Sequence, residues 1–272
     1  MTPIVSRSRL LLLCAGLVLA ASALLSGCAT PVDTVATPSE WQTPADDSEA
    51  RRRARTRLAL ASGYYENGQY AVALDELKKT LQIDPGFPDA YNLGGLIYLA
   101  LGDRALAASH FQRALALNPR DADAMHNLGW LECENGRYAE AAALFQRAVA
   151  VPTYGGRAKT LMTQGICEAR AGQPEQAEAT LMRAYELDAG NPVTGYNLAL
   201  LLFRRGELER ARFYIRRLNN SELANAESLW LGIRVEQRLR DQRAMEQLAS
   251  QLRQRFPQSR ELIAYERGQF DE

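Results

Sequence analysis

The stretch PDAYNLGGLIYLALGDRALAASHFQRALALNP, residues 88–119, decides the fold. Apolar residues recur in it at helical spacing, first at Tyr91, Gly95 and Tyr98 and again after a Leu-Gly-Asp break at residues 101–103. The spacing therefore predicts two antiparallel helices joined by a tight turn. A helix pair of this size cannot bury its own apolar face, so it needs neighbours of the same kind.

The rest of the chain repeats this unit. Glycine recurs at intervals of 34, 34, 36 and 34 residues, and an alanine follows five residues after each glycine. Glycine permits the turn between two helices, and the small alanine lets the second helix lie close against the first. A glycine series and an alanine series that share the same intervals over five units predict a repeat architecture. The positions are Gly68, Gly102, Gly136, Gly172 and Gly206, and Ala73, Ala107, Ala141, Ala177 and Ala211.

These positions resemble the tetratricopeptide repeat (TPR) over about residues 54–257. The resemblance implies an all-α superhelical solenoid of about six helix-pair repeats, with a final helix at 259–267 that caps the open end. Unit six departs most, with Arg240 in place of the turn glycine and Met245 in place of the alanine. The expected units are about 54–87, 88–121, 122–157, 158–191, 192–225 and 226–257, with a cap at 258–272, inside a TPR domain at 51–272.

The N-terminus carries the most specific local signal. Two arginines precede an almost unbroken apolar run at residues 10–25, and Leu-Ser-Gly-Cys follows and ends at Cys28. That order indicates a secretory signal, and the run is shorter than the roughly 20 residues of a membrane-spanning helix. Its end resembles a bacterial lipobox, which implies a lipoprotein signal peptide at 1–27 and lipidation of Cys28. An ordinary secretory peptide with an incidental cysteine is the alternative.

The residues after Cys28 set the expected location. Ala29 rather than aspartate follows the cysteine, which in lipoproteins of this kind indicates the outer membrane. Because several acyl chains anchor a protein stably, we expect a lipid-anchored protein that faces the periplasm and does not cross the membrane. Residues 28–50 are rich in proline, threonine, serine and acid, which predicts a flexible tether of roughly 25 Å. Folded structure should start near residues 46–49, where cap-forming residues precede a helical run.

The composition argues against several functions. Lys+Arg and Asp+Glu both number 32, so the chain lacks the basic excess of a nucleic-acid-binding protein. No phosphate loop, metal motif or nucleophile with a base has a recognisable spacing, so we expect no enzyme, cofactor or small-molecule substrate. His126, Trp130 and Cys133 share one helix face, but a metal would need further ligands that the sequence does not offer nearby.

Two cysteines remain in the exported chain. Cys14 leaves with the signal peptide and Cys28 is expected to be lipidated, which leaves Cys133 and Cys167. They fall on first helices of adjacent units, where backbones are typically 8–10 Å apart, whereas a disulfide tolerates a Cα separation of about 7 Å. We therefore expect buried free thiols, with a disulfide as the alternative.

A TPR stack offers a concave groove lined by the first helices of its units. The usual TPR geometry implies an apolar and aromatic lining, which suits the capture of an extended or helical protein segment by hydrophobic anchors. For each lining residue the alternative is packing between neighbouring helices. The expected lining is Leu58, Tyr65, Asn92, Leu96, Leu99, His126, Trp130, Cys133, Met162, Ile166, Tyr196, Leu200, Phe203 and Trp230.

Two further features stay open. The arginine-rich run at 51–57 is either a solvated helix face or a contact to lipid or a partner. The two extra residues between units three and four fall in a loop at 152–156, which either connects or binds.

The order of lipobox, tether, TPR units and closing segment resembles the type IV pilus biogenesis and stability lipoprotein family, PilF/PilW. The most telling stretches are ESLWLGIRVE at 227–236 and the ending at 255–270. The resemblance implies a pilotin, an outer-membrane lipoprotein that binds the secretin subunit of the pilus machine and promotes its localisation and multimerisation. Lipid anchoring would raise the local concentration of the groove where the secretin assembles. The alternative is a general periplasmic TPR scaffold that recruits peptidoglycan or envelope-assembly enzymes.

Overall fold

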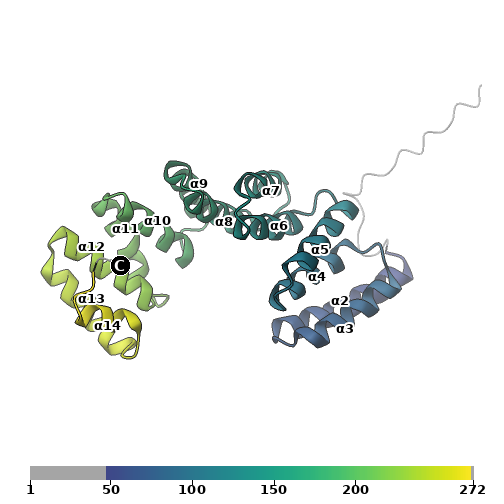
Figure 1. Ribbon diagram of the computed structural model, residues 1–272, viewed down its shortest axis with the longest axis horizontal. Coiled ribbons are helices and arrows are strands. Elements are labelled where there is room, and N and C mark those ends of the chain that lie inside the picture. Colours follow the sequence, from purple (N-terminus) through teal and green to yellow (C-terminus); the bar gives the residue numbers. More distant parts are fainter. Residues whose placement is uncertain (1–46, 271–272) are drawn as a thin grey trace, which may run out of the picture. The chain divides into compact units, whose positions relative to one another are not determined.

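The computed structural model describes residues 47–270, and this part of the chain forms thirteen helices and no strand (Figure 1). The predicted signal peptide, the lipidation of Cys28 and most of the tether lie outside the described residues. In chain order the helices are α2 (Glu49–Glu66), α3 (Tyr70–Ile83), α4 (Pro88–Ala100), α5 (Arg104–Leu117), α6 (Ala122–Glu134), α7 (Tyr138–Ala150), α8 (Arg157–Arg170), α9 (Pro174–Leu187), α10 (Pro192–Arg204), α11 (Leu208–Asn219), α12 (Ala226–Leu239), α13 (Gln242–Arg255) and α14 (Arg260–Glu266).

The helices pack as six consecutive pairs, from α2 with α3 to α12 with α13. The first helix of each pair also contacts the first helix of the next pair, so the pairs stack in chain order. The last helix, α14, packs against α12 and α13. The predicted fold class, an all-α TPR solenoid with a capping helix, is confirmed.

The turn between the two helices of each pair has the same backbone form throughout. The five predicted turn glycines have φ between 72° and 84°, a left-handed conformation that side-chain-bearing residues rarely adopt. In the last pair Arg240 takes this place with φ 61°. Unit six therefore keeps the turn without the residue that adopts it most easily.

Small residues let the two helices of a pair approach each other. The five predicted alanines are all fully buried. Gly94 and Gly95 on α4 make the approach closest, because a Cβ added at either would lie 2.3 Å from a ring on α5, that of His110 or Phe111. In the last pair the larger Met245 occupies the alanine position and is buried there with Leu248 and Leu252.

The first helix starts where the sequence predicts it. Ser48 caps α2, its hydroxyl accepting a hydrogen bond from the backbone N–H of Arg51 at 3.1 Å. The arginine-rich run is only partly a solvated face, because Arg51 pairs with Asp84 and Arg57 donates to Glu76 at 2.7 Å. These contacts tie α2 to α3 and to the residue that follows it.

A disulfide joins Cys133 on α6 to Cys167 on α8, with their Cα atoms 5.9 Å apart. The prediction of free thiols was wrong. The spacing of 8–10 Å applies to helix axes, and each Cα lies about 2.3 Å from its own axis, so Cα atoms on facing sides come much closer. The bridge crosses from unit three to unit four and links positions 34 residues apart.

The loop inserted between these units is fastened at both ends. Arg157, the first residue of α8, donates from Nη2 to the carbonyl oxygens of Val151 and Pro152, both at 3.0 Å. The hydroxyl groups of Tyr154 and Thr160 lie 2.9 Å apart and share a hydrogen bond. The contacts hold the loop against the start of α8.

Candidate functional site

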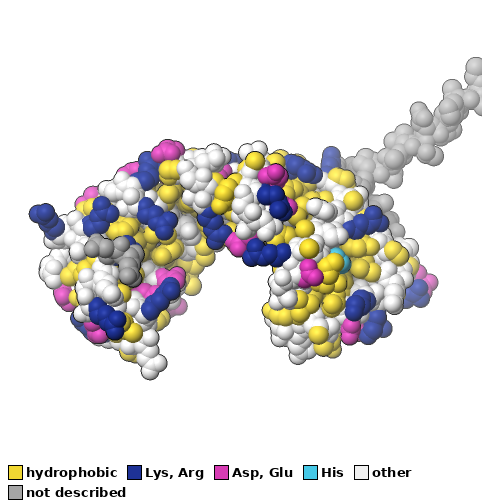
Figure 2. All heavy atoms as spheres, in the orientation of Figure 1, with side chains coloured by type: hydrophobic (Ala, Val, Ile, Leu, Met, Phe, Trp, Pro, Cys, Tyr) yellow, Lys and Arg dark blue, Asp and Glu magenta, His cyan; other side chains and the backbone are white. Residues whose placement is uncertain are grey.

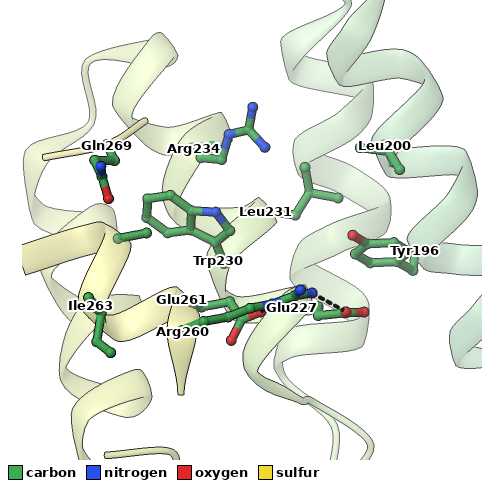
Figure 3. Close-up of a pocket in the computed structure, with 11 residues that line it drawn as sticks. Tyr196, Leu200, Glu227, Trp230, Leu231, Arg234, Arg260, Glu261, Ile263 and Gln269 are labelled. Carbon is green, nitrogen blue, oxygen red and sulfur yellow. Dashed lines mark hydrogen bonds and ion pairs between the residues drawn. The ribbon is translucent and has the colours of Figure 1, made fainter. Parts of the chain in front are cut away.

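Predicted groove residues from two units meet at a pocket of about 520 Å³, which we call the C-terminal pocket (Figure 3). Tyr196 and Leu200 reach it from α10, Trp230 from α12 and Ile263 from α14. Figure 3 shows the indole of Trp230 facing the space between α10 and α14. An apolar space with aromatic walls suits an inserted hydrophobic side chain of another protein.

Charged residues surround this apolar space and largely neutralise one another. Arg260 donates to Glu227 at 3.1 Å and to Glu261 at 2.8 Å, and Figure 3 marks the first of these contacts. Arg234 donates from Nε to the backbone oxygen of Phe270 at 3.1 Å. Because the two arginines and the two glutamates of the rim balance in charge, the pocket selects more for apolar contact than for net charge.

Trp230 is held in place from two sides. Its ring stacks on Phe270 with centroids 5.5 Å apart, and Phe270 meets Tyr265 edge-on at 6.1 Å. The start of α12 is fixed by a reciprocal cap, in which Asn225 accepts from the N–H of Ser228 at 2.8 Å and Ser228 Oγ accepts from the N–H of Asn225 at 3.0 Å. A fixed helix start and a stacked ring preorganise the indole for binding.

Tyr196 supplies a polar group on the opposite wall. Burial raises the pKa of its hydroxyl, and the charge of Glu227 acts in the same direction. The hydroxyl therefore stays protonated at neutral pH and remains able to donate a hydrogen bond to a bound segment.

The other predicted groove residues lie on the first helices of their units but do not line the C-terminal pocket. His126, Phe203 and Cys133 are buried, which favours the packing alternative for these three. The remaining residues are half-buried and occupy α2, α4, α6 and α8: Leu58, Tyr65, Asn92, Leu96, Leu99, Trp130, Met162 and Ile166.

Several of these half-buried residues make contacts across units. Asn127 on α6 donates to Asn92 on α4 at 2.9 Å, and Arg170 on α8 lies 4.9 Å above the ring of Trp130. Part of the polar and aromatic character predicted for the groove is therefore used to join neighbouring helices.

His126 is a packing residue that also bonds across units. Its Nδ1 lies 2.9 Å from the hydroxyl oxygen of Thr160 on α8. Burial lowers the pKa of His126 to about 4, and the nearby charge of Lys159 adds to the shift. Across residues 47–270, no group of three or more His, Cys, Asp or Glu side chains is placed to hold a metal ion.

Sequence reasoning missed the contribution of α14 to the pocket. The helix was predicted only as a cap, yet it supplies Arg260, Ile263 and Ala264 to the lining. The sequence did carry a signal that this helix has a second apolar side. Leu262, Ile263 and Ala264 are consecutive on a helix of seven residues, so their side chains cannot all face the same side. Leu262 is buried and Ile263 is exposed.

The surface carries both signs of charge. Figure 2 shows acidic and basic side chains interspersed over the helices, with hydrophobic side chains gathered over α2 to α5 on this face. Among the helices of residues 47–270, none is both long and apolar enough to span a bilayer.

Comparison with known proteins agrees with the architecture. The family described as "Tetratricopeptide repeat" matches residues 92–155, and the one described as "TPR repeat" matches residues 62–102. A comparison with curated proteins found no match. The solved TPR protein YrrB, described as having an unusual peptide-binding site, has a TM-score of 0.55 at 15% identity and covers 70% of this chain and 97% of its own, so it shows the fold alone. The protein is a TPR protein.

Two solved structures define its family. PilW, described as a widely conserved type IV pilus biogenesis factor, has a TM-score of 0.72 and 30% identity and covers 78% of this chain and 97% of its own. PilF of Pseudomonas aeruginosa has a TM-score of 0.72 and 27% identity and covers 81% of this chain and 100% of its own. The chain belongs to the PilF/PilW family of TPR proteins.

Proposed function

We propose that this protein is an outer-membrane lipoprotein that binds the secretin subunit of a type IV pilus machine and promotes secretin localisation and multimerisation. One observation carries the proposal, namely the likeness to PilW over nearly the whole length of that pilus biogenesis factor. The TPR fold is a protein-interaction fold, so the proposed role is binding rather than catalysis.

The C-terminal pocket supports the binding part of the proposal. Trp230 and Tyr196 form aromatic walls, and Ile263 remains 46% exposed at the edge. Aromatic residues that become buried when a partner binds dominate the energetics of many protein interfaces. We propose that a hydrophobic side chain of the secretin segment inserts between these residues.

The disulfide supports the proposed location. A bridge between Cys133 and Cys167 persists in an oxidising compartment such as the periplasm and is rare in the cytosol. Lipidation at Cys28 would hold the TPR domain at the membrane where the secretin assembles. Tethering of this kind raises the effective concentration of the two partners without any new contact.

Deletion in the native host tests the function as a whole. We expect heat-stable secretin multimers to disappear from the outer-membrane fraction on a blot, and surface pili to be lost. Reintroduction of the intact chain should restore both. Normal multimers and normal pili in the deletion strain would contradict the pilotin proposal and favour the general scaffold.

The anchor and the pocket have separate tests in the complemented strain. Cys28→Ser should leave a folded protein that is recovered in the soluble fraction, and continued recovery with the outer membrane would contradict anchoring through Cys28.

Ile263→Glu places a charge at the pocket edge and should abolish co-purification of the secretin. Leu106→Glu is the matched control, because Leu106 is 43% exposed and lies on α5, outside the pocket. Equal recovery with both variants would exclude the pocket from secretin binding.

A further inference from the structure

Three buried glutamates occupy the same position in different units, four residues before the residue at the turn. They are Glu132 on α6, Glu168 on α8 and Glu236 on α12, and they are 7%, 4% and 1% exposed. Because an ionised carboxylate is costly to bury alone, each needs a partner of opposite charge or a full set of hydrogen bonds.

Two of the three glutamates have arginine partners. Glu132 pairs with Arg137, the residue that follows the turn glycine of its unit. Glu236 accepts from Nε of Arg212 and from Nε of Arg216, both at 2.9 Å. In both cases an arginine of the same chain neutralises the buried carboxylate.

Glu168 has no such partner within residues 47–270. Gln173 stands at the place that Arg137 holds in unit three, one residue after the turn glycine. Glu168 Oε1 accepts from Gln164 Nε2 at 2.7 Å and from Gln176 Nε2 at 3.1 Å. Its other oxygen, Oε2, is buried and has no hydrogen-bond partner in the described part of the chain. The carboxylate is therefore only half satisfied.

This carboxylate lines a second pocket, of about 350 Å³, between α7, α8 and the start of α9. We call it the Glu168 pocket. The half-buried Tyr138 gives it an aromatic wall, the fully buried Phe145 also borders it, and the exposed Gln173 and Gln176 stand at its edge. A negatively charged group thus lies in a pocket with apolar sides and amide groups at the entrance.

We propose that the Glu168 pocket is a docking site for an arginine side chain of a partner protein. A guanidinium group is planar, stacks on aromatic rings and is weakly hydrated, so it suits an aromatic-walled pocket better than the compact ammonium of lysine. Its five donors match Glu168 Oε2 and the amide oxygens of Gln173 and Gln176. The arginine of the partner then neutralises Glu168 in the way that Arg137 neutralises Glu132.

The inference does not depend on the secretin proposal, because none of the helices that form the C-terminal pocket contributes to the Glu168 pocket. A partner that engages one pocket is not required to engage the other. The two sites are therefore tested separately.

A titration of the purified, isotope-labelled protein with a small probe tests the proposal. The probe is N-acetyl-arginine amide, and its control is N-acetyl-citrulline amide, which has nearly the same shape but no charge. We expect saturable shifts of the side-chain NMR signals of Gln164, Gln173 and Gln176 with the arginine probe and none with citrulline. Equal shifts with the two probes, or no shift with either, would overturn the proposal.

Two variants locate the binding on the carboxylate. Glu168→Gln should weaken binding of the arginine probe about tenfold or more, because it removes the charge-assisted hydrogen bond. Gln173→Arg should weaken it by a similar factor, because the new arginine would pair with Glu168 as Arg137 pairs with Glu132. Gln112→Arg is the control, since it adds the same charge on α5, at an exposed position outside the pocket. Unchanged binding in Gln173→Arg would overturn the proposal even if Glu168→Gln failed to fold.

Discussion

The middle of the stack and its last pair are held together by different kinds of interaction. Between α6 and α8 the buried links are a disulfide, Cys133 with Cys167, and an uncharged hydrogen bond, His126 with Thr160, while one ion pair, Arg170 with Glu134, lies at the exposed surface. Both buried links join positions 34 residues apart. Between α11 and α12 the links are charges, because two arginines of α11 contact Glu236 of α12.

The difference shows that a repeated backbone does not require repeated chemistry. The same stacking of helix pairs relies on covalent and neutral contacts at the buried positions in the middle, and mainly on ion pairs to a buried carboxylate at the end. The middle should therefore respond to reductant and to acid, and the end to the loss of charged groups. Four predictions test this division, from the largest expected effect to the smallest.

Loss of the arginines at the end should have the largest effect. The double variant Arg212→Met and Arg216→Met leaves Glu236 buried without a counter-charge, which should lower the free energy of unfolding by about 3–5 kcal/mol. Urea denaturation followed by circular dichroism measures this. Arg53→Met is the control, because its pair with Glu49 is exposed and should be worth less than about 1 kcal/mol. A loss below that value in the double variant would contradict the importance of the ion pairs.

Loss of the disulfide should weaken the middle by nearly as much. Cys133→Ala with Cys167→Ala opens a loop of 34 residues, which should cost about 3–4 kcal/mol. A reductant should destabilise the native protein by the same amount and leave the double variant unchanged. If the reductant destabilised both proteins equally, the effect would not arise from this bridge.

Acid should act on the middle through His126. Its pKa in the folded protein is about 4, against about 6.5 when unfolded, so between these values the unfolded chain binds more protons. The free energy of unfolding should therefore fall as pH falls from about 6.5 to 4, by up to roughly 3 kcal/mol from this residue. His126→Gln should remove that part of the slope. Burial also lowers the pKa of His110, so some slope should remain in the variant, and equal slopes in the two proteins would contradict the prediction.

The turn of the last pair should show the smallest effect. Arg240 adopts the left-handed conformation that glycine adopts at the other five turns. Arg240→Gly should therefore raise the free energy of unfolding by about 1 kcal/mol. Gly172→Arg in the middle should lower it by a similar amount. A loss of stability in Arg240→Gly would mean that the arginine side chain itself stabilises the last pair.

The repeat could be predicted from the sequence because its signals are local. A turn glycine and a close-packing alanine act within one helix pair, and both recur at a fixed interval. The turn keeps the same left-handed backbone conformation at Arg240, although the residue there is not glycine. The spacing therefore predicted the helix pairs, and the resemblance to the TPR predicted the capping helix.

The candidate site could be predicted only in part, because it depends on relations between pairs. Helical spacing places His126 and Trp130 on one face, but a small rotation of the helix decides which of them is buried. The same uncertainty affected Cys133 and Cys167, whose Cα separation depends on which sides of α6 and α8 face each other. The role of Ile263 depends on where α14 lies relative to α10, and no sequence interval encodes that.

The disulfide also has a mechanical consequence. A stack of repeats opens by separation of neighbouring pairs, and separation is easiest at the ends, where a pair has only one neighbour. The bond between Cys133 and Cys167 prevents α6 and α8 from parting while the bond is intact. Separation of pairs that starts at α2 or at α14 therefore cannot part unit three from unit four while the bond is intact. A force applied along the stack would load this bond before it separated the two halves.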